Sequence, residues 1–168
     1  MLSPDAILAR LEHSLSLLKG GMNDLPVRQQ ALRATIDWSY NMLDDEHKRL
    51  FRDLSVFKGG FTLDAAELVF TDTPEDADLF QGIESLVDKS FVFPEDTGTG
   101  EPRFHLLETM REYGIEKLKE EGTFESLHDR HAGYYKSLVA ALCPSLRGRE
   151  LKGSLDQLDE DYGNIRDA

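Results

Sequence analysis

Two histidines and one cysteine are the side chains of this sequence that most readily suggest metal chemistry. His128 and His131 are three residues apart, a spacing that places two imidazoles on one face of a helix. Cys143 is the only cysteine, and it lies about three helical turns further along the chain. It cannot reach the histidines without a chain reversal. We therefore interpret both histidines as ordinary core or surface residues and predict no metal site.

Signatures of catalysis and nucleotide binding are missing from the sequence. Neither Gly20-Gly21 nor Gly59-Gly60 is followed by the lysine that a phosphate-binding loop requires. No serine, histidine and aspartate carry the local residues of a catalytic triad, and no base adjoins the cysteine. We predict that the chain is not an enzyme, has no catalytic residues and binds no cofactor by itself.

Nucleic-acid recognition is the remaining chemistry, because the order of expected elements is that of a winged helix-turn-helix. The stretch from Phe61 to Gly100, which would supply the reading helix and the wing tip, contains one cation, Lys89, and ten acids. The expected reading helix, residues 78–88, offers Asp78, Gln81, Glu84 and Asp88 as its polar groups. Carboxylates repel phosphates, so we expect no specific DNA binding through this face.

Hydrophobic periodicity, caps and breakers position these residues on a series of helices and one hairpin. Ser3-Pro4 begins a helix that stops at Gly20-Gly21, and Thr62 caps a short helix with Phe61 as a hydrophobic staple against Ala66. The other helices are expected over residues 28–43, 44–57, 79–89, 107–118, 124–142 and 151–165, and the wing strands over 90–93 and 103–106. The fold class is mainly α: a winged helix-turn-helix with a small hairpin wing, flanked by an N-terminal helix and the start of a C-terminal helical region.

Composition supports a globular protein with an acidic surface. The net charge is −13, and 40% of the 168 residues are hydrophobic, enough for a sizeable core. The single cysteine excludes an internal disulfide, and no apolar run approaches the length of a membrane span. We expect a cytoplasmic location and no membrane partner. The absence of a helix-ending signal after Ile165 indicates a piece of a longer protein.

Four blocks of sequence carry a resemblance to a known family: residues 28–40 (RQQALRATIDWSY), 50–57 (LFRDLSVF), 85–90 (SLVDKS) and 103–113 (RFHLLETMREY). They closely resemble the region that follows the ATPase core in bacterial AfsR/LuxR-type STAND regulators, which are related to NB-ARC proteins. The resemblance implies three parts: residues 1–21 end a helical domain, 22–121 form the winged-helix domain, and 122–168 begin a TPR-like helical-repeat sensor. It also implies a lever that transmits ATP or ADP occupancy between an upstream P-loop ATPase domain and downstream repeats.

The resemblance also suggests which residues contact neighbouring domains. Many members carry Met-His-Asp after the wing, where the histidine touches the ADP phosphate; this chain has Leu106-Leu107-Glu108, and leucine cannot donate that hydrogen bond. The expected interdomain contacts are Arg28, Arg33, Trp38, Leu107, Glu108 and Arg111. At helical spacing beside Tyr40, Trp38 is interpreted as a packing residue rather than a platform for a nucleic-acid base.

Two other functions stay open. The first is a free-standing winged-helix transcription factor that contacts DNA through Arg28, Arg33, Lys48, Arg49 and Arg52 instead of the usual reading helix. The second is an interaction adaptor whose acidic middle recruits a basic partner. The first predicts DNA affinity that falls steeply with salt, and the second predicts salt-sensitive capture of protein. Transcriptional regulation of the parent protein is what the family resemblance suggests.

Overall fold

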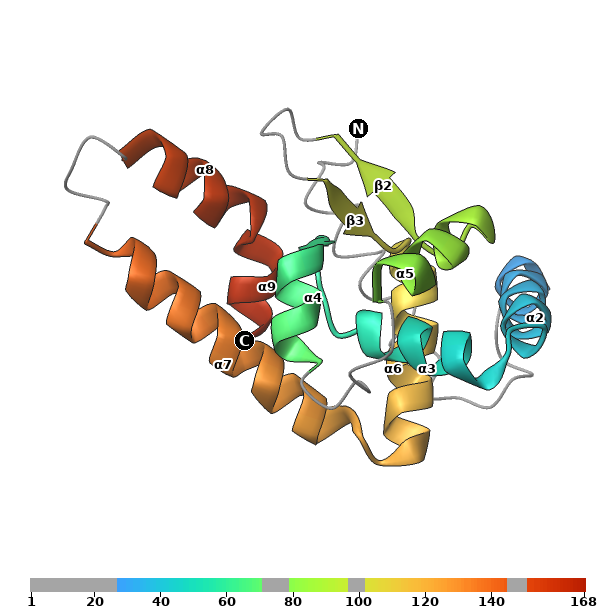
Figure 1. The fold of residues 1–168 in the computed structure, drawn as a ribbon. Helices are drawn as coiled ribbons and strands as arrows, with labels where there is room; N and C mark the ends of the chain where they lie inside the picture. The colour runs from blue at the N-terminus through green and yellow to red at the C-terminus, as the bar shows by residue number, and fades with distance from the viewer. Residues whose placement is uncertain (1–26, 71–78, 97–101, 145–150) are drawn as a thin grey trace, which may run out of the picture. The chain divides into compact units, whose positions relative to one another are not determined.

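The computed structural model describes residues 27–70, 79–96, 102–144 and 151–168. The chain divides into two compact units, residues 1–42 and 43–168. The helix expected over residues 3–20 and the tip of the wing lie outside the described residues. The boundaries expected at residues 21 and 121 stay predictions, while the second unit contains both the winged helix and the helices that follow it (Figure 1).

In the first unit the structure describes helix α2, Val27–Asn41. Its end at Asn41 is close to the expected end at Leu43. Trp38 is 66% exposed and so is not a core packing residue, while the interdomain contact predicted for it stays a prediction. The side chain of Arg28 lies outside the described part, and Arg33 is half-buried.

Three short helices form the helix-turn-helix of the second unit: α3 (Asp45–Leu54), α4 (Leu63–Val69) and α5 (Leu79–Asp88). Two local caps explain where the first two begin. The Asp44 carboxylate accepts a hydrogen bond from the His47 backbone N–H at 2.8 Å, and the Thr62 hydroxyl accepts one from Ala65 at 3.2 Å. The predicted helices are confirmed, although α3 ends three residues before Phe57.

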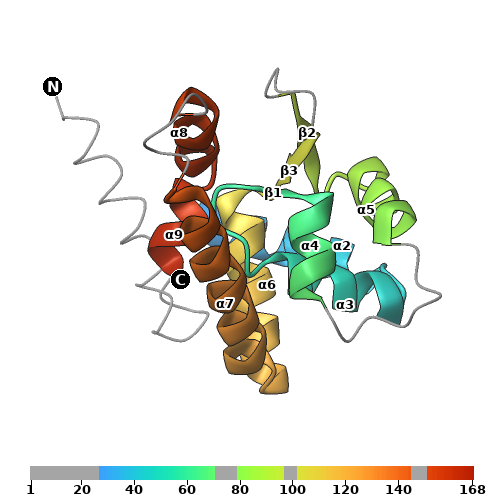
Figure 2. The ribbon, with the colours of Figure 1, turned by 60° about the vertical axis from the view of Figure 1, so that its left-hand side comes forward.

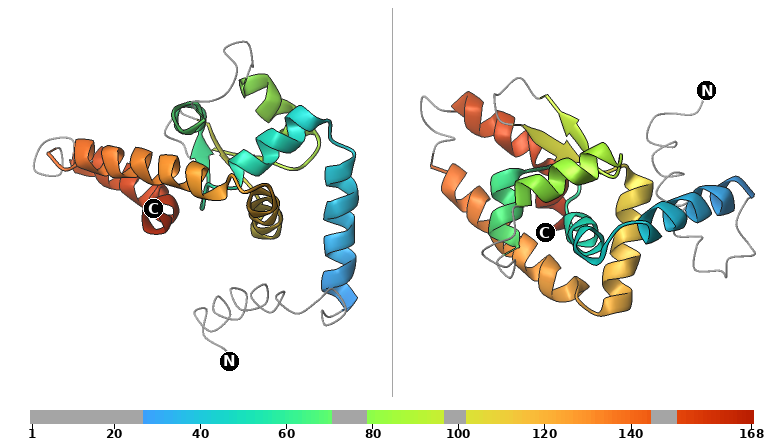
Figure 3. Two further views of the ribbon diagram at one scale, coloured as in Figure 1. Left: turned by 90° about the horizontal axis from the view of Figure 1, so that it is seen from below. Right: turned by 45° about the vertical axis from the view of Figure 1, so that its right-hand side comes forward.

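The wing belongs to a three-stranded antiparallel sheet of order β1-β3-β2, made of β1 (Phe61–Thr62), β2 (Phe93–Glu95) and β3 (Arg103–His105). Figure 3 shows the β2–β3 hairpin beside α5. The strand expected over residues 90–93 is wrong in its bounds, because β2 shares only Phe93 with it. Strand β1 was not expected at all. Phe61 pairs with Phe104 in the sheet rather than only stapling a helix.

The residue at which β2 begins follows from how α5 ends. The backbone N–H groups of Phe91 and Val92 bond to the Leu86 carbonyl at 2.9 and 3.3 Å, so both residues close the helix and are not free to pair in a strand. Pro94 is then included in β2, opposite Phe104. Proline is tolerated there because β2 is an edge strand, where the missing N–H breaks no ladder bond on the outer side.

Helix α6 (Glu108–Glu121) follows the sheet and packs closely on α3. Gly114 makes this approach possible: a Cβ atom built on it would lie 2.6 Å from Ser55 Cβ and 3.4 Å from Phe51 Cε1, and would overlap Ser55 Oγ. Phe51 also meets Phe91 edge-on with ring centroids 5.0 Å apart. The core of the winged helix is therefore centred on the α3–α6 contact.

Three further helices complete the second unit: α7 (Phe124–Leu142), α8 (Leu151–Glu160) and α9 (Tyr162–Asp167). Helix α7 packs on α4 and α6, and α9 packs on α7 (Figure 2). The single helix expected over residues 151–165 is wrong, because the chain changes direction at Asp161. Of the five large apolar residues whose spacing indicated this helix, Leu151, Leu155 and Tyr162 are 43%, 49% and 61% exposed, and Leu158 and Ile165 are half-buried. The buried residues of α8 and α9 are Ser154 and Asn164, with Asp161 between the helices.

Candidate functional site

The face that reads DNA in a winged helix-turn-helix is acidic in this protein. On α5, Gln81, Glu84 and Asp88 are exposed, and so is the apolar ring of Phe80. Lys89, directly after the helix, donates hydrogen bonds to the Ser85 hydroxyl and, at 3.4 Å, to the Ser85 carbonyl. Two acids and one neighbouring cation therefore face the space that a phosphate backbone would occupy.

The wing strands add little positive charge to this face. Glu95 is exposed on β2, and its carboxylate lies 3.9 Å from His105 Nδ1 on β3. The ring of Phe93 stacks on His105 with centroids 5.7 Å apart. Arg103, the one arginine of the three strands, is buried and points away into the polar network described below.

The basic residues of α3, an alternative DNA-binding surface, are paired with acids. Lys48 lies 4.0 Å from Asp45, and Arg49 lies 3.7 Å from Asp53. Arg52 reaches across to Glu121 on α6 at 3.0 Å. Burial raises the pKa of Asp53 to about 6, against the opposing effect of the nearby arginines. This basic face is thus largely neutralised by its own fold.

The residues predicted to contact neighbouring domains around the start of α6 point in different directions. Leu107 is the N-cap residue of α6 and is 49% exposed, and Glu108 is also exposed. Arg111 is buried, and its Nε and Nη2 atoms donate hydrogen bonds to the two carboxylate oxygens of Glu108 at 3.1 and 3.0 Å. Its Nη1 atom donates to the Ser55 carbonyl at 3.5 Å, so Arg111 ties α6 to the end of α3.

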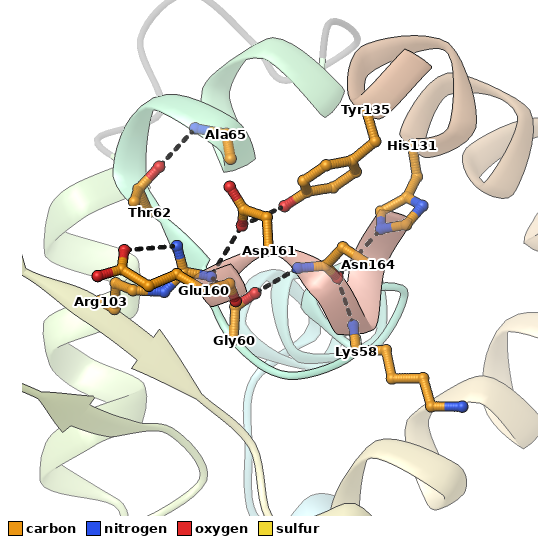
Figure 4. A network of polar contacts seen from close by, with 10 residues as sticks. All are labelled: Lys58, Gly60, Thr62, Ala65, Arg103, His131, Tyr135, Glu160, Asp161 and Asn164. Atoms are coloured by element: carbon orange, nitrogen blue, oxygen red, sulfur yellow. Dashed lines mark hydrogen bonds and ion pairs between the residues drawn. The ribbon is translucent and has the colours of Figure 1, made fainter. Parts of the chain in front are cut away.

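A buried polar network joins the winged helix to α9, and sequence reasoning missed it (Figure 4). Its first half is centred on Arg103 of β3. The Nη2 atom of Arg103 donates to the Asp161 carboxylate at 2.9 Å and to the Glu160 carbonyl at 3.3 Å. The Tyr135 hydroxyl of α7 donates to the same Asp161 oxygen at 3.5 Å. Burial raises the pKa of Tyr135, so the hydroxyl keeps its proton and stays a donor.

The second half of the network is centred on Asn164 of α9. Its Nδ2 group donates to the Gly60 carbonyl at 2.7 Å, and its Oδ1 atom accepts from the Lys58 backbone N–H at 2.6 Å. These two bonds fix the orientation of the amide. His131 Nε2 lies 3.3 Å from the same Oδ1 atom, and it must therefore carry the proton.

His131 is fully buried, and its Nδ1 atom has no hydrogen-bond partner. The ring packs against Phe57 and Tyr135, with centroids 5.3 and 4.8 Å away. Burial lowers the pKa of His131, which keeps the imidazole neutral. Its neighbour His128 bonds to the Asp167 carbonyl at 3.1 Å, and Cys143 is exposed. Within the described residues, no group of three metal-ligating side chains converges.

Over the residues that the structure describes, no helix is both long enough and apolar enough to cross a bilayer.

The fold and its residues define the class of this domain. Residues 43–119 match the family model described as a winged helix-turn-helix domain. The match begins before α3 and ends within α6, the part that contains the three helices and the sheet. This part of the chain therefore has the fold of a winged helix-turn-helix domain.

Curated relatives extend this finding to a class of regulatory proteins. The chain is 42% identical over 144 residues, 84% of its length, to "Putative HTH-type transcriptional regulator Rv0890c" of Mycobacterium tuberculosis (strain ATCC 25618 / H37Rv). It matches "Putative HTH-type transcriptional regulator Mb0914c" of Mycobacterium bovis equally well. It is also 36% identical over 138 residues, 80% of its length, to "Uncharacterized protein Rv0894" of the same M. tuberculosis strain.

The chain spans only part of these relatives. It covers 16% of the two HTH-type regulators and 35% of the third protein. No solved structure matches the chain. The comparisons support a regulatory winged-helix segment, and they back the alternative of a winged-helix transcription factor better than the ATPase lever.

Proposed function

We propose that this chain is a non-enzymatic winged-helix module of a transcriptional regulator, and that the module acts through contacts with protein rather than with DNA. Homology to proteins named as HTH-type transcriptional regulators supports the regulatory role. The acidic charge of the winged helix is the observation that supports contacts with protein rather than with DNA.

All nine lysines and arginines between residues 43 and 119 lie among the described residues, and each has a partner. The partners are Asp45 for Lys48, Asp53 for Arg49, Glu121 for Arg52, Asp167 for Lys58, Ser85 for Lys89, Asp161 for Arg103, Glu108 for Arg111, Glu120 for Lys117 and the ring of Phe124 for Lys119. Eighteen acids occupy the same stretch of sequence. Seven of the nine partners are carboxylates, whereas the partners of Lys89 and Lys119 are neutral. DNA affinity arises largely from counterion release when cations neutralise phosphates, so a stretch in which acids outnumber cations and most cations are paired with acids opposes binding.

The resemblance to STAND regulators suggests one way in which such a module acts. As a lever it would contact an upstream ATPase domain and downstream repeats, and it would respond to ATP or ADP bound elsewhere. The exposed side chains of Leu107 and Glu108 are available for such a contact. Arg111 would act indirectly, because its guanidinium is held inside the domain by Glu108 and Ser55.

Direct DNA binding is the second candidate, favoured by the helix-turn-helix family and by the names of the relatives. In this case the exposed face of α5 would have to approach a phosphate backbone despite Glu84 and Asp88. The two candidates differ in a measurable way, because binding through phosphates weakens steeply as salt increases.

The test is a fluorescence-anisotropy titration of a labelled DNA duplex with the whole chain at about 20 mM and about 200 mM salt. The proposal predicts no binding at either salt concentration. The double variant Glu84→Lys, Asp88→Lys should then gain salt-sensitive binding, because it reverses two charges on α5. Glu125→Lys, Asp129→Lys is the matched control: both residues are exposed at the same spacing on α7, away from the reading face. Salt-sensitive binding by the unmodified chain would overturn the proposal in favour of DNA recognition.

A further inference from the structure

The C-terminal helices α8 and α9 bury polar side chains and leave three of their five large apolar side chains exposed. Ser154, Asp161 and Asn164 are buried and Leu158 and Ile165 are half-buried, whereas Leu151, Leu155 and Tyr162 are exposed. An amphipathic helix that belongs permanently to a core buries its apolar stripe instead. The attachment of these helices therefore relies on polar contacts more than on apolar burial.

The place of attachment is the turn that leads into β1. The Asn164 side chain accepts a hydrogen bond from the Lys58 N–H and donates one to the Gly60 carbonyl, as Figure 4 shows. Gly163 lies directly on this turn: a Cβ atom added to it would overlap the Lys58 carbonyl oxygen and lie 3.4 Å from the Gly59 Cα. Such close backbone packing is possible only for glycine.

Helix α9 also packs on α7, where Tyr135 bonds to Asp161, His131 to Asn164 and His128 to the Asp167 carbonyl. The remaining attachments are ionic. Asp161 and Glu160 face Arg103 at 2.9 and 3.8 Å, and Asp167 lies 3.6 Å from the Lys58 ammonium group. When such contacts open, water replaces each lost partner, so the net cost per bond is small. Regions held by few apolar contacts open locally at lower free energy than the core of their domain.

We propose that α8 and α9 form a detachable clamp on the sheet side of the winged helix, which opens while α3, α5 and α6 stay folded. Opening uncovers the turn at residues 58–60 and removes three acids, Glu160, Asp161 and Asp167, from Arg103 and Lys58. The clamp thereby controls the charge of the sheet side. This inference stands independently of the proposed function, since it depends only on how the helices are attached.

Hydrogen exchange of the whole chain, read by mass spectrometry at peptide level, tests the clamp. In the unmodified protein, the amides of α9 and of residues 58–62 should exchange at least about 10-fold faster than those of α3 and α6. Gly163→Ala should increase exchange in α9 and at residues 58–62 by at least a further ~10-fold, because the new methyl group fits the open state but not the closed one. Exchange in α3 and α6 should not change.

Gly153→Ala is the matched control. It places the same methyl group on α8, where a Cβ atom would meet nothing within 4 Å, so exchange at α9 should stay as in the unmodified chain. The proposal is overturned if α9 in the unmodified protein is as protected as α3 and α6. It is equally overturned if Gly163→Ala raises exchange in all helices together or unfolds the chain, since α9 would then be part of one cooperative core.

Discussion

Replacing Gly114 by alanine should destabilise the second unit by about 2 kcal/mol. The added methyl group would lie 2.6 Å from Ser55 Cβ, between two helices whose side chains at this point are completely buried. Overpacking of this kind costs about 1–3 kcal/mol. Ser55 can retreat only by giving up the 2.8 Å hydrogen bond from its hydroxyl to the Phe51 carbonyl, which costs about 1 kcal/mol more. The higher helix propensity of alanine offsets about 1 kcal/mol of this destabilisation.

Urea unfolding followed by far-ultraviolet circular dichroism measures this loss, which should also lower the Tm by about 6 °C. Gly133→Ala on α7 is the control: nothing lies within 4 Å of its Cβ position, so stability should rise by about 0.5–1 kcal/mol. Adding Ser55→Gly to Gly114→Ala should recover part of the loss, since it removes the overlapping atoms. A Gly114→Ala protein as stable as the unmodified chain would refute the close α3–α6 contact.

Two further substitutions test the polar groups. Asn164→Ala should lower the free energy of unfolding by about 2 kcal/mol, because two hydrogen bonds to the backbone, each worth about 1 kcal/mol net, are lost. Gln157→Ala, at an exposed position of α8, should change it by less than about 0.5 kcal/mol, and equal urea midpoints for the two variants would contradict the network. Burial, helped by the Glu108 charge, raises the pKa of Glu112 to about 7, so the folded state keeps a proton that the unfolded state loses near pH 4.5. Stability contributed by this proton is present below pH 4.5 and is lost as the pH rises through 7; Glu112→Gln should remove that decline, and parallel pH profiles of the two proteins would be the contrary result.

Local signals explain why the helices of the winged helix were predictable. Thr62 caps its helix as expected, and Asp44, also a short polar residue directly before a periodic segment, caps α3 in the same way. Gly122 ends α6 with a left-handed backbone, a conformation that glycine adopts readily. The order of helices and hairpin was sufficient to predict the fold class.

Elements that depend on distant partners could not be predicted in this way. β1 has only two residues, too few for an alternating pattern, and it exists because Phe61 pairs with Phe104 from another part of the chain. The strand expected over residues 90–93 was misplaced because Phe91 and Val92 are β-prone, yet their N–H groups close α5. Tertiary hydrogen bonds overrode local propensity in both cases.

The candidate site was the least predictable part. Asn164 bonds to residues more than 100 positions earlier in the chain, and no local motif marks it. The spacing of Leu151, Leu155 and Tyr162 indicated a helix, but these three side chains are exposed, and Asp161 and Asn164, which are buried, bond to partners on the winged helix. The acidic character of α5, by contrast, was readable directly, because it depends only on composition and helical spacing.

The central claim is that the reading face of this winged helix does not bind DNA. Residue-resolved amide shifts in a ¹⁵N NMR spectrum, recorded while a DNA duplex is added at about 20 mM salt, test it most directly. The account predicts that the amides of Leu79–Asp88 on α5 and of both wing strands keep their positions throughout the titration. Progressive shifts confined to α5 and the wing, and reversed by adding salt, would contradict it.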